Sequence, residues 1–330
     1  MAGVSVRAGV EAAAVERLTE GIEPLEMRRI LERCLSGNLS PAVALMQLLI
    51  DSEDAVVVRA VVDEVTQRGA SVSRSGDSLL RDRVDELTQL VVDNERGCDK
   101  IAEMLRADMD SPARARTVEE GIAFCEKLFD WSVQQSEEAS VALYSLGNPQ
   151  LLERATKEII EQLDQWGVTG SDVKVLDFGC GIGRLALELA PRVREVHGID
   201  VSTQMINAAL RRCASLSNVH LLKGTGKNLR EFGDGGFDAV LAVDTFPYLY
   251  QSGEALVEIH FREAARVLRP GGNFIVLNFS YRGDETADRA EVLRLASEAG
   301  FDILVSGERP FVLWDGLAFH LRRRTILPLA

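Results

Sequence analysis

Cysteines, basic side chains and long apolar runs are all scarce in this chain of 330 residues. The five cysteines are scattered, odd in number and without CxxC spacing, which argues against a disulfide framework and a structural zinc site. Acidic residues outnumber basic ones by 51 to 37, and the net charge of −14 makes nucleic acid a poor partner. The apolar runs are far shorter than the ~20 residues of a membrane span, and the first residues lack the apolar core of a signal peptide. We therefore expect a cytoplasmic protein with no nucleic-acid or membrane partner.

Residues 1–140 are predicted to form an all-α domain. Capping residues, first-turn prolines and apolar spacing predict helices over 24–35, 41–50, 52–69, 80–91 and 118–134, with Ser40 and Ser52 starting the second and third. The valines of the third would also suit a strand. Because this region holds no phosphate loop, metal cluster or nucleophile motif, we expect a lid or dimerisation domain. A winged-helix DNA-binding module is disfavoured by the acidic charge.

Residues 141–330 alternate between strand and helix patterns. After a helix that begins at Asn148-Pro149, strands are expected over 174–178, 193–199, 219–222, 237–243 and 273–279, and helices over 184–189, 202–215, 255–268 and 288–299. This alternation predicts an α/β fold with a doubly wound, mostly parallel sheet. Two closing strands, 302–308 and 313–322, are near enough in sequence to form a C-terminal antiparallel hairpin, which gives seven strands.

The strongest chemical motif runs from Val175 to Gly183, where an apolar strand carries Asp177 near its end and enters a GxGxG turn. Glycines let the backbone turn sharply and let a ligand approach where a Cβ would block it. In doubly wound sheets, ligands bind at the carboxyl ends of the strands. A dinucleotide loop would follow the pattern GxGxxG, but the third glycine position is Arg184, which disfavours a nicotinamide-dependent oxidoreductase.

Three further strand ends carry acidic or small residues. Asp200 ends the second strand about 20 residues after the first glycine, where a carboxylate can accept hydrogen bonds from both ribose hydroxyls. The alternative for Asp200 is a helix cap, although Ser202 would serve that role too. The third strand is followed by Gly224-Thr225-Gly226, which leaves room for a flat base, and the fourth ends in Asp244-Thr245.

The segments DFGCGIGR, HGIDVSTQMINAA and RVLRPGGNFIVLN together resemble the landmarks of the class I S-adenosylmethionine-dependent methyltransferase family, which has a Rossmann-like fold. The resemblance covers about residues 140–324 and implies S-adenosylmethionine as cofactor, while it says almost nothing about the substrate. It implies a methionine end flanked by Asp177, Gly179 and Gly181 and covered by Tyr144, a ribose bound by Asp200, an adenine beside Val201 and Met205, and a sulfonium near Asp244. The full set of expected cofactor-binding residues adds Cys180, Gly224, Thr225, Gly226 and Thr245.

Two positions in this set need comment. Many relatives carry an acidic residue where this chain has Thr225 and use it to bind the adenine amino group, so Thr225 or Asn228 would have to replace it. Cys180 is better explained by its small size in a tight turn than as a methyl-carrying nucleophile. Its basic neighbour in sequence, Arg184, cannot act as a base.

The acceptor side has no catalytic signature, which decides little, because alignment of an activated methyl group alone contributes roughly 7–11 kcal/mol. Candidate substrate-facing residues follow the later strands and the final hairpin: Phe246, Tyr248, Asn278, Tyr281, Trp314 and Asp315. Core packing is the alternative for Phe246 and Trp314. The candidate catalytic groups are Tyr248, Tyr281 and His320, whose unperturbed pKa lies near neutrality, although a lone strand histidine is more often structural. His197 and His220 are expected to be packing residues, and no metal site is predicted.

The sequence therefore predicts methyl transfer from S-adenosylmethionine to a small molecule, with oxygen or nitrogen acceptors favoured over carbon, by a homodimer. Two alternatives besides the oxidoreductase remain open. One is a methyltransferase acting on protein or nucleic acid, which would need an extended groove. The other is a scaffold that retains cofactor binding without turnover.

Overall fold

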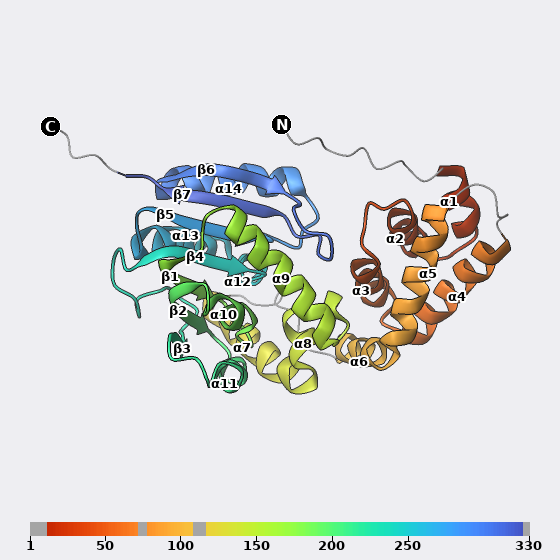
Figure 1. Ribbon diagram of the computed structural model, residues 1–330, viewed down its shortest axis with the longest axis horizontal. Coiled ribbons are helices and arrows are strands. Elements are labelled where there is room, and N and C mark those ends of the chain that lie inside the picture. Colours follow the sequence, from red (N-terminus) through yellow and green to blue (C-terminus); the bar gives the residue numbers. More distant parts are fainter. Residues whose placement is uncertain (1–11, 72–77, 108–116, 326–330) are drawn as a thin grey trace. The chain divides into compact units, whose positions relative to one another are not determined.

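The computed structural model describes residues 12–71, 78–107 and 117–325 (Figure 1). The contacts between these residues divide the chain into two compact units, one helical and one built on a sheet. The helical unit takes its described residues from the chain up to 107, from 142–152 and from 312–315, and the sheet unit takes the rest. This division differs from the predicted boundary at residue 140, because two helices that precede it pack in the sheet unit.

The helical unit begins with helices of ordinary length. These are α1 (Ala12–Thr19), α2 (Leu25–Leu35), α3 (Pro41–Ser52), α4 (Ala55–Ser71), α5 (Ser78–Asp93) and α6 (Glu95–Arg106), and a 3-10 turn η2 (Leu143–Ser145) follows later in the chain. Ser40 caps α3 as predicted, since its hydroxyl accepts a hydrogen bond from a first-turn amide at 3.2 Å. Ser52 ends α3 and does not begin α4, because Asp54 takes the capping role and accepts from the Val56 amide at 2.8 Å.

The valine-rich segment 55–71 is a helix and not a strand. Val58, Val62 and Val65 recur at i, i+4 and i+7 and are buried, whereas Val56 is 64% exposed. The predicted stripe of α5 is buried in the same way at Leu80, Val84, Leu87 and Val91. Helical periodicity therefore outweighs the strand preference of β-branched residues here.

The sheet unit has seven strands in the order β3-β2-β1-β4-β5-β7-β6 (Figure 1). Their bounds are β1 (Gly170–Phe178), β2 (Val193–Asp200), β3 (Val219–Lys223), β4 (Phe237–Val243), β5 (Leu268–Leu277), β6 (Phe301–Glu308) and β7 (Ala318–Arg323). The first five strands pair in parallel, and β7 pairs antiparallel with both β5 and β6. The predicted α/β fold, with a doubly wound sheet and an antiparallel C-terminal pair, is confirmed.

Helices cover both faces of this sheet, with α9 in front of it and α13 and α14 behind it in Figure 1. The helices of the sheet unit are α7 (Val118–Gln135), α8 (Glu137–Val141), most of α9 (Pro149–Gln165), α10 (Arg184–Leu189), α11 (Thr203–Arg212), α12 (Phe246–Ser252), α13 (Glu254–Val267) and α14 (Glu285–Ala299). The core beneath α13 and α14 is rich in phenylalanine, including the fully buried Phe246, Phe261 and Phe274. Burial on both faces explains why the central strands read as continuous apolar runs.

One local prediction for this unit is wrong, and one helix was not predicted. The last strand begins at Ala318 and not at residue 313, because residues 312–315 pack in the helical unit, where the Leu313 carbonyl accepts from the Ser40 hydroxyl at 3.1 Å. No element was predicted over 246–252, but this segment forms α12, in which Pro247 occupies a first-turn position that lacks an amide partner anyway. The chain after β4 therefore turns at once into a helix that carries Tyr248.

Candidate cofactor and acceptor site

The GxGxG segment forms a turn at the carboxyl end of β1 that only glycine fits at two positions. Gly179 and Gly181 have φ angles of 75° and 50°, in the left-handed region. A Cβ on Gly179 would collide with the Thr245 side chain, and one on Gly181 would come 2.7 Å from Val141. The Gly179 amide donates to the Ile199 carbonyl at 2.8 Å, which ties the turn to the end of β2.

Asp177 lies under this turn with an unused acceptor. The residue is 1% exposed, and its Oδ2 atom has no hydrogen-bond partner among the described residues. Burial raises the pKa of this carboxyl to about 7, while the charge of Arg184 opposes the rise and that of Asp200 adds to it. A buried carboxylate oxygen without a donor suits a cationic ligand group, such as the ammonium of the cofactor's amino-acid portion.

Asp200 organises the backbone on both sides of the turn. Its Oδ2 accepts from the Gly181 amide and its Oδ1 from the Ser202 amide, each at 2.9 Å. Burial raises the pKa of Asp200, and these backbone hydrogen bonds work against that rise. The helix cap of α11 is Ser202, whose hydroxyl accepts from the Met205 amide at 3.0 Å. Asp200 thus fixes the glycine turn at the place where a ribose acceptor is predicted.

The residues predicted around adenine differ in what they offer. Val201 is half-buried, whereas Met205 is 1% exposed and belongs to the core. Gly224 packs closely enough on Ile199 that a Cβ would come 2.6 Å from it. The Thr225 hydroxyl accepts from the Lys227 amide at 3.3 Å, a long bond that leaves this oxygen a second lone pair.

Helix α7 lies against this group of strand ends, and sequence reasoning did not assign it to the site. Ile122 faces Gly226, where a Cβ would come 3.0 Å from its Cγ2 atom. Asp130 accepts from the Ser202 hydroxyl at 2.6 Å and from the Gln204 amide at 2.9 Å, so it binds the start of α11 from outside. Exposed ion pairs join α7 to the end of β3, as between Lys223 and Glu126 at 2.5 Å, and to the loop after it, as between Lys227 and Glu119 at 2.8 Å. The sequence signal that could have placed this helix was the set of acidic residues within 118–134. The residues with which they pair lie about 70 residues or more further along the chain.

Four predicted residues meet at the ends of β4 and β5. Asp244 and Asn278 both adopt left-handed conformations, with φ of 54° and 69°. The side-chain amide of Asn278 donates to Asp244 Oδ1 at 2.9 Å. Short polar side chains tolerate this conformation better than others. The Tyr281 hydroxyl reaches the same Asp244 oxygen at 3.4 Å, and the rings of Tyr281 and Tyr248 meet edge to face at 5.8 Å.

Neither tyrosine of this group is a ready base. Burial, and then the nearby charge of Asp244, raise the pKa of the Tyr248 hydroxyl above its usual range. The same two causes raise the pKa of Tyr281, a residue that is 52% exposed although its hydroxyl lies against Asp244. Both hydroxyls therefore stay protonated near neutral pH, where they donate hydrogen bonds, and Asp244 is the acceptor that they surround.

The other predicted acceptor residues are not part of this group. Phe246 is fully buried and packs against the rings of Phe261, Phe274 and Phe279, as its core alternative would have it. His320 pairs across the sheet with Ile275 and forms a hydrogen bond with the Asn273 side chain at 2.9 Å. Ile275 and Asn273 lie two and four residues before the end of β5. Burial lowers the pKa of His320 to about 4, so this imidazole is neutral near pH 7.

Tyr144, Trp314 and Asp315 belong to the helical unit. There Tyr144 and Trp314 are buried, with ring centroids 6.2 Å apart, and Asp315 lies within 3.5 Å of Gln47. The predicted role of Tyr144 in covering the cofactor stays a prediction. Thr245 and Cys180 do lie in the sheet unit: the Thr245 hydroxyl donates to the Phe178 carbonyl at 2.8 Å, and burial raises the pKa of the Cys180 thiol well above its usual range. A thiol that stays protonated is inert, as expected of a packing residue.

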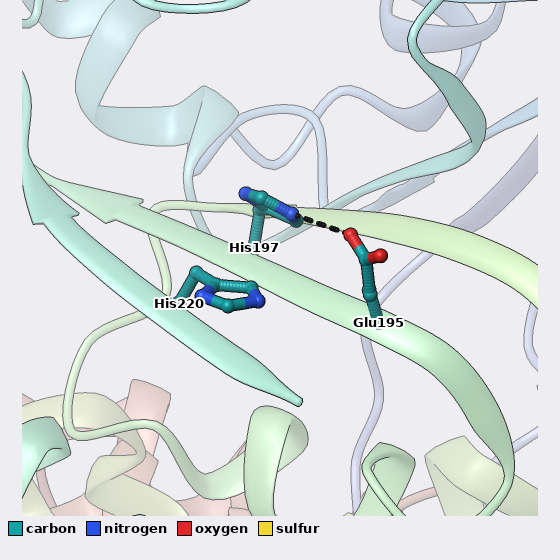
Figure 2. Close-up of side chains that lie close together, drawn as sticks. All are labelled: Glu195, His197 and His220. Atoms are coloured by element: carbon teal, nitrogen blue, oxygen red, sulfur yellow. Dashed lines mark hydrogen bonds and ion pairs between the residues drawn. The ribbon is translucent and has the colours of Figure 1, made fainter. Parts of the chain in front are cut away.

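Two histidines that were expected to be packing residues, His197 and His220, lie next to each other. Cross-strand pairing sets His197 on β2 opposite His220 on β3, and Glu195 lies on the same face as His197 because side chains alternate along a strand (Figure 2). One ligand atom from each of the three side chains lies within 4.8 Å of the other two. The period of two between Glu195 and His197 was visible in the sequence, but the register with β3 was not.

The arrangement at the strand ends fits an S-adenosylmethionine molecule on two structural grounds. The glycine turn presents backbone where side chains would block a ligand, and Asp177 offers a buried carboxylate oxygen without a donor among the described residues. Within the same described ranges, none of the helices has both the length and the apolar character needed to cross a membrane.

Comparison with known proteins agrees with this assignment. Residues 175–272 match the family model described as "Methyltransferase domain". The chain is 34% identical over 115 residues to demethylmenaquinone methyltransferase of Tropheryma whipplei, covering 35% of this chain and 45% of that protein. It is 31% identical over 150 residues to phosphoethanolamine N-methyltransferase 1 of Arabidopsis thaliana, covering 45% and 28%.

A further relative is YqeM of Bacillus subtilis, at 31% identity over 157 residues, covering 44% of this chain and 62% of that protein. The chain thus spans less than two thirds of the length of each of these curated relatives. Among solved structures, phosphoethanolamine N-methyltransferase 1 of Haemonchus contortus, crystallised with phosphoethanolamine and S-adenosylhomocysteine, superposes with a TM-score of 0.51 at 18% identity, over 65% of this chain and 51% of that one, and shares the fold. The matched segment and these relatives support the class I S-adenosylmethionine-dependent methyltransferase family for the sheet domain of this chain, with S-adenosylmethionine as its cofactor.

Proposed function

We propose that this protein transfers the methyl group of S-adenosylmethionine to a small molecule, with an oxygen or nitrogen atom as acceptor. The observation that carries the proposal is the polar group of Asp244, Asn278 and Tyr281, which lies at the same edge of the sheet as the glycine turn and Asp177. Two curated relatives support a small acceptor, since their names specify demethylmenaquinone and phosphoethanolamine.

The cofactor side binds and orients. Asp177 offers its free oxygen to the ammonium group of the amino-acid portion, and the turn at Gly179 and Gly181 lets that portion approach the backbone. Asp200 is placed to receive the ribose hydroxyls, for which it has lone pairs beyond those used by the Gly181 and Ser202 amides. The bound cofactor supplies a methyl group on a positively charged sulfur, which is already activated for displacement.

The acceptor side aligns a nucleophile and receives its proton. Asp244 is the acceptor available for that proton, because both tyrosines stay protonated near neutral pH and His320 lies elsewhere on β7. Tyr248 packs edge to face against Phe129 of α7 at 4.8 Å, so α7 and α12 together present aromatic surface beside Asp244. Aromatic edges and faces suit a flat or cationic acceptor and exclude water from the reacting atoms.

The experiment that tests the cofactor is calorimetric titration of the purified chain with S-adenosylhomocysteine and, in parallel, with NAD. We expect micromolar binding of the first and none of the second. Asp200→Ala should weaken S-adenosylhomocysteine binding at least tenfold, because charge-assisted hydrogen bonds contribute about 1.5–3 kcal/mol each. Asp172→Ala, which removes an exposed carboxylate at the start of β1, is the matched control and should leave the affinity unchanged.

The acceptor class is tested by formation of S-adenosylhomocysteine with panels of phenols, small amines, peptides and RNA. Turnover with a small amine or phenol supports the proposal, and turnover confined to peptide or RNA contradicts it. NAD binding alone would overturn the methyltransferase assignment. Tight cofactor binding without turnover on any panel would favour a scaffold.

We further propose that the helical unit forms a homodimer interface. The support is the set of large apolar side chains that its helices expose, among them Val56 at 64% and Val92 at 65%. Sedimentation velocity of the full chain tests this interface. Val56→Asp should shift a dimer toward monomer. If the substitution leaves the sedimentation coefficient unchanged, an interface that includes Val56 is contradicted.

A further inference from the structure

Strands β2 and β3 carry a cluster of metal-ligating side chains that the methyltransferase function does not use. Glu195, His197 and His220 each bring one ligand atom within 4.8 Å of the other two (Figure 2). His197 Nε2 and Glu195 Oε2 are 3.1 Å apart, and the two imidazole rings lie 4.7 Å apart with an angle of 37° between them. We propose that these three residues bind a divalent transition-metal ion of the zinc type.

The donor set fits this ion in kind and in number. Two imidazole nitrogens and one carboxylate oxygen are a common protein set for zinc, with water as the fourth ligand. At zinc–ligand distances of about 2.0–2.1 Å, tetrahedral ligands lie about 3.3 Å apart. His197 and Glu195 are close to this separation at 3.1 Å, and the exposed His220 has a ligand atom within 4.8 Å of both, so it must move closer by at most about 1.5 Å.

Strand geometry holds the ligands in register. Glu195 and His197 are two residues apart on β2 and so share a face of the sheet, and His220 is the direct cross-strand partner of His197. Since β3 is the edge strand and has only five residues, a metal ion here would clamp the edge of the sheet. The site lies apart from the cofactor, because His197 precedes the end of β2 at Asp200 by three residues, or about 10 Å along a strand.

Among the described residues, Lys174 is the cationic side chain besides His197 that pairs with the Glu195 carboxylate, and it competes with a metal ion for that carboxylate. Its Nζ atom lies 3.0 Å from Glu195 Oε2 and 5.4 Å from the centroid of the Phe237 ring. The aromatic face gives the ammonium an alternative position when the carboxylate turns to a metal. The competition predicts an effect that an ordinary ion-pair cluster would not show: removing Lys174 should strengthen metal binding.

The test is titration of the full chain with Co²⁺, followed by its visible d–d absorption, and with Zn²⁺ by calorimetry. We expect one equivalent of metal to bind, with the intense absorption of a tetrahedral cobalt site and without the near-ultraviolet band of thiolate ligation. The second criterion excludes the five buried cysteines as ligands. His220→Ala and Glu195→Gln should each weaken binding at least tenfold, and Lys174→Ala should tighten it severalfold.

Arg194→Ala is the matched control, because this exposed residue lies on β2 but alternates to the other face. It should bind metal as the native chain does. Zn²⁺ should also raise the melting temperature of the native chain and not that of His220→Ala, since an ion that binds only the folded state stabilises it. The proposal is overturned if the native chain binds neither ion below millimolar concentration, or if His220→Ala binds as tightly as the native chain.

Discussion

The proposed cofactor side and the proposed acceptor side of the strand-end site are built in different ways. On the cofactor side, backbone forms the site. Gly179 and Gly181 have no Cβ to collide with neighbouring side chains, and Asp200 fixes the glycine turn by accepting hydrogen bonds from the Gly181 and Ser202 amides. On the acceptor side, side chains make the site: Asp244, Asn278 and Tyr281 meet after separate strands, and Phe129 of α7 packs on Tyr248. Substitutions on the first side should therefore damage cofactor binding and folding together, whereas those on the second should change turnover and leave the fold intact.

The largest effect is expected from Gly179→Ala. The new Cβ would force a left-handed residue and displace the Thr245 side chain, which together should cost about 2–4 kcal/mol of folding free energy. Thermal melting and S-adenosylhomocysteine titration measure the two losses. Gly233→Ala is the control, because a Cβ there meets nothing within 4 Å. An unchanged melting temperature and affinity in Gly179→Ala would contradict a turn built by backbone.

This turn is also where the sequence is most informative. A contiguous motif such as Val175–Gly183 carries its own geometry, so the strand, the turn and helix α10 were all predicted near their observed bounds. Asp244 and Asn278 were both named as site residues because ligands bind at the carboxyl ends of parallel strands, but the hydrogen bond between them was not predicted. The position of α7 did not follow, because Asp130 and Ser202 lie 72 residues apart and no local pattern links them. For the same reason residues 313–315 were assigned to a strand, although Leu313 and Asp315 have their partners in α3 and the preceding turn.

A second prediction concerns the charge of Asp177 in the ligand-free protein. Its pKa rises from 3.8 to about 7 on folding, so between these values the folded chain holds a proton that the unfolded chain has lost. This contribution to stability is present below pH 4 and is lost as the pH rises through 7. The free energy of unfolding of the native chain should therefore fall by a few kcal/mol over that interval from this group.

Asp177→Asn should remove that slope and weaken S-adenosylhomocysteine binding, because the amide carries no charge for the cofactor's ammonium group. Urea unfolding at pH 5, 6, 7 and 8 measures the slope. The control is Asp172→Asn, an exposed carboxylate in the same strand, which should keep it. Equal slopes for the native chain and Asp177→Asn would mean that Asp177 is not the titrating group.

A third prediction tests the link between α7 and the cofactor side. Asp130→Ala removes the acceptor for the Ser202 hydroxyl and the Gln204 amide, so α7 should exchange its amide hydrogens faster. Cofactor affinity should fall about threefold to tenfold, the equivalent of one or two net hydrogen bonds. Lys127→Ala, an exposed position on the same helix, is the control. Faster exchange without any loss of affinity would show that α7 covers the strand ends without contributing to cofactor binding.

The smallest effect is expected from Tyr281→Phe, and it separates the two sides most cleanly. The lost hydroxyl donates to Asp244 over 3.4 Å, a long bond whose removal should cost about 0.5–1 kcal/mol and slow methyl transfer about twofold to fivefold. Cofactor affinity should not change, because Tyr281 contacts Asp244 and Tyr248 and not, among the described residues, the glycine turn. Tyr250→Phe is the control, since its hydroxyl accepts from Arg282 at 2.9 Å and not from the Asp244 group. If Tyr281→Phe instead weakened S-adenosylhomocysteine binding at unchanged turnover, Asp244 and Tyr281 would belong to the cofactor side, and the acceptor would have to bind elsewhere along the strand ends.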